Sequence, residues 1–264
     1  MRQVSAASAN MTGADLTETD LTDADLCNGT LSSANLRETD LTRANLNGVT
    51  ATSAKLTFVS AQGSNLSNAN LTSATLVGGD FSGSDIVLTH FDSATITHTD
   101  FTATIGNYTT WTSATLTRPK FNDSDLTGAN FTSSAITEFT APGATLDNAN
   151  FSKTNTGLKG ADLNGASMLG ATVSEIDLSE AKISDASLKG ATFEGSNLTS
   201  VNAQRSDFSE TDIRDANLTR ARFDSSDFTN SNMKSSVLTQ TGLRKANLTG
   251  VDVSYSEFDR TNIG

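Results

Sequence analysis

The chain has 264 residues, of which only 36% are hydrophobic and 6% aromatic, too few large side chains for a broad globular core. The formal net charge of −12 argues against direct nucleic-acid binding, because phosphate contacts require Lys and Arg. No run of eighteen apolar residues occurs, so we expect no membrane span. The N-terminal residues MRQVSAASAN lack the hydrophobic segment of a secretion signal, which favours a cytoplasmic location.

A large apolar residue recurs at every fifth position from Leu16 to Phe151 and, after a shift of two residues, from Leu158 to Ile263. We call this residue the centre of its pentapeptide. Of the 50 centres, 45 are Leu, Ile, Val, Met, Phe or Trp, and the exceptions are Ala51, Ala61, Gly106, Ala141 and Ala203. Such self-similarity at a fixed period indicates a repeat architecture.

Each pentapeptide contains one very short strand. A small residue lies two positions before the centre and an Asp or Asn usually stands between them, as in Ala14-Asp15-Leu16. This pattern places the small residue and the centre inside and the polar residue outside. The two remaining residues are mostly Thr, Ser, Gly, Asn or charged, and they suit a turn. One unit cannot bury its own centre, so successive coils must stack.

The aromatic centres indicate how many sides form one coil. They lie at multiples of ten residues apart, with aliphatic centres between them, so like residues stack only if the number of sides is even. A four-sided coil of twenty residues places Phe81, Phe101 and Phe121 on one side. The sequence therefore predicts an all-β, quadrilateral parallel β-helix of about 12 coils.

The shift of two residues divides the predicted solenoid. We expect an N-terminal cap segment at 1–10, a first solenoid at 11–152, a bulge at 153–157 and a second solenoid at 158–264. Thr156 stands where the next centre would fall, and Leu158 can take that place if the intervening residues bulge outward. Gly and Asn suit such a bulge because they accept left-handed dihedrals. The bulge is either a tolerated insertion or a hinge. Beyond it, the ten-residue alternation of aromatic centres ends.

The runs ADLTETDLTDADL (14–26) and ANLRETDLTRANL (34–46) resemble the pentapeptide repeat family, whose motif is A(D/N)LXX. The resemblance covers essentially the whole chain beyond the first ten or so residues and implies a right-handed quadrilateral β-helix. The best-known relatives resemble DNA, occupy the DNA-binding saddle of bacterial gyrase and modulate inhibitors such as fluoroquinolones. The resemblance thus implies a protein partner, with DNA gyrase or another topoisomerase as the most specific candidate.

The sequence offers no constellation for catalysis or metal binding. His90 precedes a centre and His98 lies in a turn, so both should lie at the surface, and the single Cys27 follows a centre. Several convergent ligands are needed for a metal site, and the spacing supplies none. We therefore expect a non-catalytic protein without a cofactor or metal.

The acidic surface is the main candidate for function. Residues 1–100 contain 11 acidic and 4 basic side chains. A coil of twenty residues places Asp20, Asp40, Asp80 and Asp100 in one outward column and Asp25 and Asp85, with Asp125, in the next. Ranks of carboxylates produce a field that a basic DNA-binding cleft would recognise, which favours a DNA mimic. Alternatively, these residues cap local turns in a generic interaction or structural scaffold.

Threonine provides a third, less favoured hypothesis. The segments Thr95-Ile96-Thr97 and Thr115-Leu116-Thr117 should lie one above the other, and flat Thr-X-Thr ranks resemble the ice-binding faces of some antifreeze proteins. Threonine is also an ordinary strand residue.

The last predicted coil exposes apolar centres and unpaired backbone groups. Two copies that meet there would bury these edges in a closed, two-fold contact. We therefore expect a homodimer through the C-terminal centres Leu248, Val253, Phe258 and Ile263.

Overall fold

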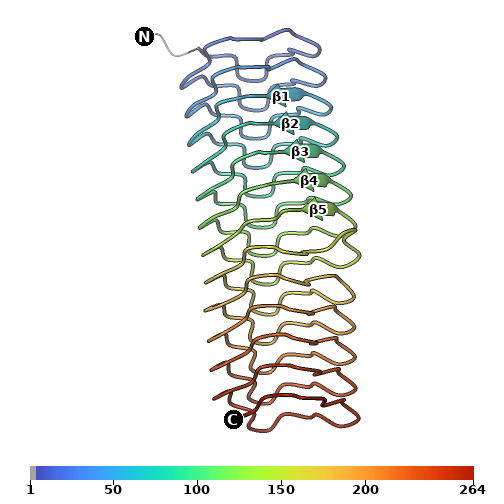
Figure 1. Ribbon diagram of the computed structural model, residues 1–264. Helices are drawn as coiled ribbons and strands as arrows, with labels where there is room; N and C mark the ends of the chain where they lie inside the picture. The colour runs from blue at the N-terminus through green and yellow to red at the C-terminus, as the bar shows by residue number, and fades with distance from the viewer. Residues whose placement is uncertain (1–3) are drawn as a thin grey trace. The chain divides into compact units, whose positions relative to one another are not determined.

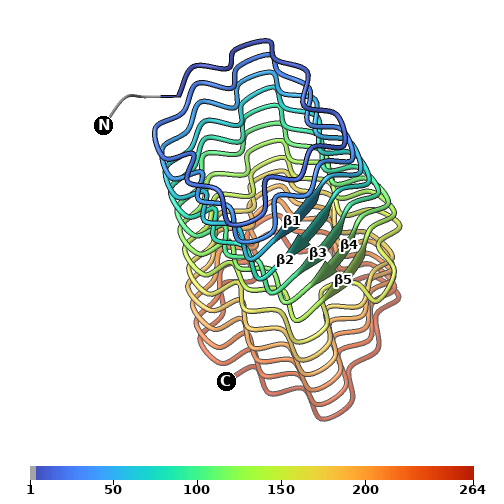
Figure 2. The same cartoon turned by 90° about the horizontal axis from the view of Figure 1, so that it is seen from above.

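The computed structural model describes residues 4–264, which divide into two compact units, one up to Ser134 and one from Ala135 to Gly264. Within each unit, parallel bridges join residues twenty apart, such as Asp20 with Asp40 and Ser187 with Asp207. Twenty residues therefore form one coil of four five-residue sides, and in each unit the coils stack on one another (Figures 1 and 2). The predicted quadrilateral parallel β-helix is confirmed.

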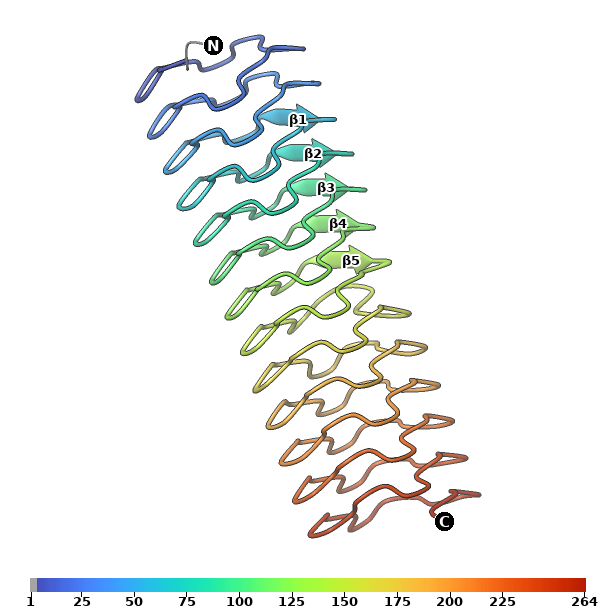
Figure 3. The same ribbon diagram turned by 90° about the vertical axis from the view of Figure 1, so that its left-hand side faces the viewer.

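Four three-residue strands lie on one side of the first unit. They are β1 (Lys55–Thr57), β2 (Thr75–Val77), β3 (Thr95–Thr97) and β4 (Thr115–Thr117), and they pair in parallel in that order (Figure 3). The second unit begins with β5 (Ala135–Thr137). Lys, Thr or Ala replaces the usual Asp or Asn at the first position of these strands, so no side-chain carbonyl competes for the backbone N–H groups.

The corners require a left-handed backbone. From Ser8 to Arg260 the second residue after each centre has a positive φ, for example 58° at Glu18 and 56° at Arg43. The N–H of the following small residue donates to the carbonyl of the centre, as from Ala24 to Leu21 at 3.0 Å. A left-handed residue other than Gly costs about 1–2 kcal/mol, so the repeated turn must be offset by stacking.

The centres fill the interior, and four of the five exceptional ones are compensated locally. Val49, Val59, Phe139 and Val201 replace the small residue two positions before Ala51, Ala61, Ala141 and Ala203. All eight side chains are buried. The large and small residues have exchanged places, which conserves the core volume of the coil. At Gly106, a Cβ atom would lie only 2.8 Å from Leu126 and 3.0 Å from Ile86, so these side chains fill the space.

The aromatic centres of the first unit stack as predicted. Phe101 lies 5.4 Å from Phe81 and 5.1 Å from Phe121 between ring centroids, and Trp111 lies 4.1 Å from Phe91. The two stacks meet edge to face across the interior, as between Phe101 and Trp111 at 5.4 Å. Both geometries are favourable for aromatic pairs.

In the second unit, one pair of aromatic centres is separated by a full coil. The ten-residue alternation ends as expected, but Phe208 and Phe228, which are twenty residues apart, stack at 5.0 Å. Phe223 contacts both rings edge to face.

The irregular segment in the second unit is a two-residue insertion. Ala135 still pairs with Asn155, whereas Thr140 pairs with Asp162, twenty-two residues on. Thr156 and Gly157 are the extra residues, both with positive φ, and the buried Leu158 occupies the next centre. A Cβ atom at Gly157 would lie 2.5 Å from the carbonyl oxygen of Asp177, so only glycine fits there.

Two boundaries differ from those expected from the sequence. The insertion lies inside the second unit, because the two units divide between Ser134 and Ala135. The solenoid also begins before residue 11, since Ser5 and Asn10 already pair with Asp25 and Thr30. Of the segment 1–10 that was expected to form a cap, residues 1–3 lie outside the described part of the chain.

Candidate functional site: two acidic columns of the first unit

The coil register brings the predicted carboxylates together. Asp20 pairs directly with Asp40, and Asp80 with Asp100, while Ser60 lies between the two pairs. In the neighbouring column, Asn45 and Asn65 separate Asp25 from Asp85. We call these six residues the acidic columns.

Each carboxylate in the acidic columns also supports its own turn. One side-chain oxygen accepts a hydrogen bond from the backbone N–H two residues further on, which is an Asx turn. The donors and distances are Thr22 to Asp20 at 3.0 Å, Thr42 to Asp40 at 2.9 Å, Ser82 to Asp80 at 2.9 Å, Thr102 to Asp100 at 2.9 Å, Cys27 to Asp25 at 3.2 Å and Val87 to Asp85 at 3.0 Å.

These hydrogen bonds favour the ionised form of Asp20, Asp25 and Asp80. The Thr22 hydroxyl and N–H lower the pKa of Asp20, and the N–H and thiol of Cys27 lower that of Asp25. At Asp80, burial opposes ionisation, but hydrogen bonds from Ser82 and Gln62 outweigh it and the pKa is lowered. Asp20, Asp25 and Asp80 are therefore charged at neutral pH.

Few cations neutralise the acidic columns. Lys120 lies 3.5 Å from Asp100, and the Gln62 amide donates to Asp80 at 2.5 Å. Asp20, Asp40, Asp25 and Asp85 form no ion pair with any of residues 4–264. Their negative field is consequently directed into solvent.

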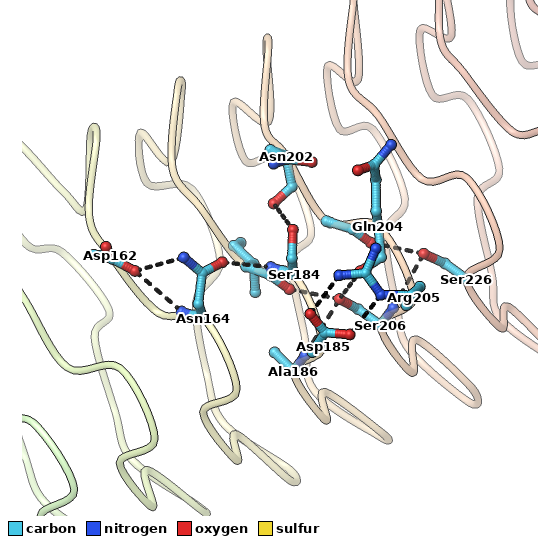
Figure 4. A network of polar contacts seen from close by, with 12 residues as sticks. Asp162, Asn164, Ser184, Asp185, Ala186, Asn202, Gln204, Arg205, Ser206 and Ser226 are labelled. Carbon is cyan, nitrogen blue, oxygen red and sulfur yellow. Dashed lines mark hydrogen bonds and ion pairs between the residues drawn. The ribbon is translucent and has the colours of Figure 1, made fainter.

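Carboxylates of the second unit have a different environment. Arg205 forms two hydrogen bonds to Asp185, at 2.7 and 2.6 Å, and faces it in Figure 4. Further cations lie about one coil away from their acidic partners: Lys182–Asp162, Arg214–Glu194, Arg244–Asp224, Lys159–Glu180 and Lys189–Glu210. The Asn164 amide oxygen accepts from the Ser184 N–H, and the Ser184 and Ser206 hydroxyls donate to backbone carbonyls of neighbouring coils in the same region (Figure 4). Much of this acidity is thus neutralised locally.

Two surface features were missed in the sequence. Asp207 and Asp227 pair directly in the second unit, and the same twenty-residue spacing could have revealed them.

The second feature is a group of exposed apolar residues in the first unit. Ile105 takes an outward position usually held by a polar residue and is 53% exposed. Leu88 and Tyr108, 47% and 60% exposed, occupy corners of the same side one coil apart. Apolar residues at positions that usually hold polar ones were the sequence signal for these exposed side chains.

The candidate reactive side chains lie apart from one another. His90 and His98 are exposed, and His90 Nδ1 lies 3.0 Å from the Thr110 hydroxyl. Cys27 is half-buried, and a hydrogen bond to the Asp25 carboxylate raises the pKa of its thiol. Among the described residues, no three His, Cys, Asp or Glu side chains converge into a metal-binding group. Residues 4–264 also contain no helix long and apolar enough to cross a membrane.

The C-terminal centres are the least covered. Leu248, Val253, Phe258 and Ile263 are 38%, 39%, 50% and 65% exposed. They contribute to an apolar cavity of about 450 Å³ that also includes Met233, Leu238 and Leu243.

Residues 4–264 form a four-sided parallel solenoid with a five-residue sequence period, and no reactive groups converge among them. These features define a repeat-scaffold protein. A profile described as pentapeptide repeats matches the chain eight times, over residues 9–48, 19–57, 52–86, 94–132, 158–195, 176–215, 216–254 and 226–263. The chain therefore belongs to the pentapeptide repeat family. No curated protein matches it.

Several solved structures are similar to the chain. A pentapeptide repeat protein from the thylakoid lumen of Arabidopsis thaliana is 28% identical, with a TM-score of 0.35; the match covers 36% of this chain and 66% of that one. HetL, a protein of the cyanobacterium Nostoc involved in heterocyst differentiation regulation, is 24% identical over 94% and 86% of the two chains, with a TM-score of 0.26. QnrB1, a plasmid-mediated fluoroquinolone resistance protein, is 21% identical over 67% and 83%, with a TM-score of 0.37.

Proposed function

We propose that the protein is a non-catalytic scaffold whose acidic columns imitate the charge of DNA and bind the DNA-binding surface of a protein partner. The supporting observation is the direct pairing of Asp20 with Asp40 and of Asp80 with Asp100. Like charges directly opposite each other in a sheet are destabilising, so the fold alone does not favour this arrangement.

Turn formation does not require the negative charge. Asn65 and Asn70 accept the same backbone hydrogen bond at 3.0 Å from Ser67 and Thr72. Asparagine would thus form the turn without repulsion between coils. The repeated carboxylates are better explained by a cationic partner, which would relieve that repulsion on binding.

DNA gyrase is the first partner to test, because DNA-mimicking members of this family act on it. Carboxylates one coil apart, such as Asp20 and Asp40, are spaced by about 4.8 Å along their column. Two neighbouring columns together present a line of negative charge that a cleft lined by Lys and Arg would attract at long range. Salt should weaken such an interaction.

The test is a supercoiling assay with purified gyrase and added protein. We expect the parent chain to reduce supercoiling or to blunt fluoroquinolone-induced DNA cleavage. Changing Asp20, Asp40, Asp80 and Asp100 together to Asn should raise the concentration required at least about tenfold.

A matched control also removes four negative charges, but from carboxylates of the second unit that have cationic partners. The substitutions are Asp162→Asn, Asp185→Asn, Glu194→Gln and Asp224→Asn. This control should retain most of the activity. Equal loss in both variants would indicate a general charge effect. Inactivity of the parent on gyrase and other topoisomerases would leave the generic scaffold as the function.

The register of the threonines favours one second candidate. Thr75, Thr95 and Thr115 align on β2, β3 and β4, and Thr97 aligns with Thr117. Aligned Thr hydroxyls and methyl groups on a flat strand face would suit an ice surface. Thermal hysteresis that is lost in the Thr95→Lys variant would support ice binding, and its absence from the parent would exclude it.

We also propose that a second copy covers the apolar C-terminal centres. Their exposure leaves a cavity of about 450 Å³ with a mainly hydrophobic lining. A two-fold contact would bury both sets of centres and close the assembly. Light scattering at micromolar concentration should give about twice the 27.6 kDa chain mass, and Phe258→Asp should halve it. A monomeric parent would refute the dimer.

A further inference from the structure

A polar hollow on the second unit interrupts an otherwise regular column. The outward residues Asp162, Lys182, Asn202, Arg222, Gly242 and Asn262 follow one another at successive coils. Gly242 is the one member of this column without a side chain. The resulting surface cavity measures about 600 Å³ and is lined mainly by Arg220, Arg222, Arg244, Gln204, Gln240 and Asn262, with Asp224.

Glycine is not required at position 242 by the backbone. Unlike the corner glycines, Gly242 has no positive φ. A Cβ atom there would lie 3.4 Å from Asp224 Oδ1 and 3.8 Å from the Ala221 carbonyl, which are ordinary contact distances. The gap therefore has no local conformational cause, and a side chain could occupy it.

Two guanidinium groups beside the gap lack the partner that other arginines of this unit have. Arg205, Arg214 and Arg244 each pair with a carboxylate twenty residues earlier. For Arg222 the residues one coil before and after are Asn202 and Gly242, and among residues 4–264 its side chain forms no ion pair. Arg220 donates only to the Gln240 amide oxygen, at 3.1 Å.

The hollow is consequently positive in a protein of net charge −12. The sole carboxylate in its lining, Asp224, is already bound by the backbone N–H and the guanidinium of Arg244, at 3.0 and 3.1 Å. Lys245 lines a smaller adjoining cavity of about 270 Å³. Neighbouring cations repel one another, so an anion that lies between them would be stabilised.

We propose that this hollow binds a small phosphorylated polyol or sugar. Guanidinium groups of Arg222 and Arg220 match the geometry of a phosphate group, to which they donate paired hydrogen bonds. Amides of Gln204, Gln240 and Asn262 both donate and accept, which suits hydroxyl groups. No aromatic side chain lines the cavity, so a stacked nucleobase is disfavoured.

Calorimetric titration of the full chain tests the proposal, with glucose 6-phosphate, inorganic phosphate and glucose as probes. We expect saturable binding of glucose 6-phosphate, weaker binding of phosphate and none of glucose. Arg222→Gln should weaken binding by about tenfold or more. Gly242→Leu should weaken it similarly without a change in charge, because the leucine fills the gap.

Lys182→Gln is the matched control, since it removes one positive charge from the same column outside the cavity, where Lys182 pairs with Asp162. It should bind as the parent does. Thermal unfolding of each variant verifies that it is folded. Absence of saturable binding by the parent, or equal loss in Lys182→Gln and Arg222→Gln, would overturn the proposal.

Discussion

The two units share one backbone geometry but distribute aromatic rings and charge differently. In the first unit, two aromatic stacks fill the interior between Phe81 and Phe131, and most members of the acidic columns lack a cation. In the second unit, many carboxylates pair with Lys or Arg about one coil away, and the aromatic centres no longer recur every ten residues. The repeat therefore fixes the fold, while the outward residues are free to give each unit its own surface.

The contrast in the cores can be measured with one substitution in each unit. Phe101 and Phe193 are both fully buried, but Phe101 contacts four aromatic rings and Phe193 contacts only Phe208 in the described structure. Replacement by Ala should cost about 3–5 kcal/mol at either site. The loss at Phe101 should be larger by about 1–2 kcal/mol, because stacking adds to burial.

Urea unfolding measures this difference. Fluorescence of Trp111, the single tryptophan, reports on the first unit, and circular dichroism reports on both. Equal losses at the two sites would show that the aromatic stacks add nothing beyond buried area.

Two glycines at and just after the insertion in the second unit can be compared in the same way, and the expected losses of stability are smaller than those in the core. Gly157→Ala should destabilise by about 3 kcal/mol, from the left-handed φ and the close approach to Asp177. Gly160 has a similar φ of 65°, but a Cβ atom added there would have no other atom within 4 Å. Gly160→Ala should therefore destabilise the protein by only about 1 kcal/mol.

Deletion of Thr156 and Gly157 completes the test of the insertion. It restores the five-residue period, so we expect the deletion variant to fold. A misfolded product, measured by circular dichroism and proteolysis, would show that the insertion supplies contacts the solenoid needs.

The five-residue period predicted the repeat, and the ten-residue spacing of the aromatic centres predicted its four sides and so the alignment of the acidic columns, because stacking then repeats each position every twenty residues. It could not predict the exchange of Phe139 with Ala141, which depends on volume shared within a coil. Nor could it locate the hollow at Gly242, which requires knowledge of the φ and of the neighbouring side chains. The ion pairs of the second unit follow from the twenty-residue spacing and could have been predicted.

The electrostatic contrast predicts different salt responses of two carboxylates. Hydrogen bonds from Thr22 lower the pKa of Asp20, whereas a hydrogen bond and the charge of Arg205 lower that of Asp185. Both carboxylates therefore stabilise the fold at pH values above their ordinary pKa of 3.8. This contribution is lost as the pH falls through the lower pKa that each group has in the folded state.

Carbon NMR titration of the two carboxylates, at low salt and in 0.5 M NaCl, distinguishes the causes. Screening should move the pKa of Asp185 toward its ordinary value and change that of Asp20 much less. The same salt response at both residues would contradict the proposed difference between the units.

The smallest expected effect concerns Cys27, which lies beside the acidic columns. Its half-buried thiol is held protonated by the hydrogen bond to the Asp25 carboxylate, which raises its pKa. Since the thiolate is the reactive form, iodoacetamide at pH 8 should alkylate Cys27 more slowly than an unstructured cysteine peptide. Asp25→Asn removes the charge and should accelerate alkylation a few-fold. Asp85→Asn, three coils further along the same column, removes an equal charge and should leave the rate unchanged. Mass spectrometry of the alkylated protein over time measures both rates. If Asp85→Asn accelerates the reaction as much as Asp25→Asn does, the overall field of the columns, and not the local hydrogen bond, controls the thiol.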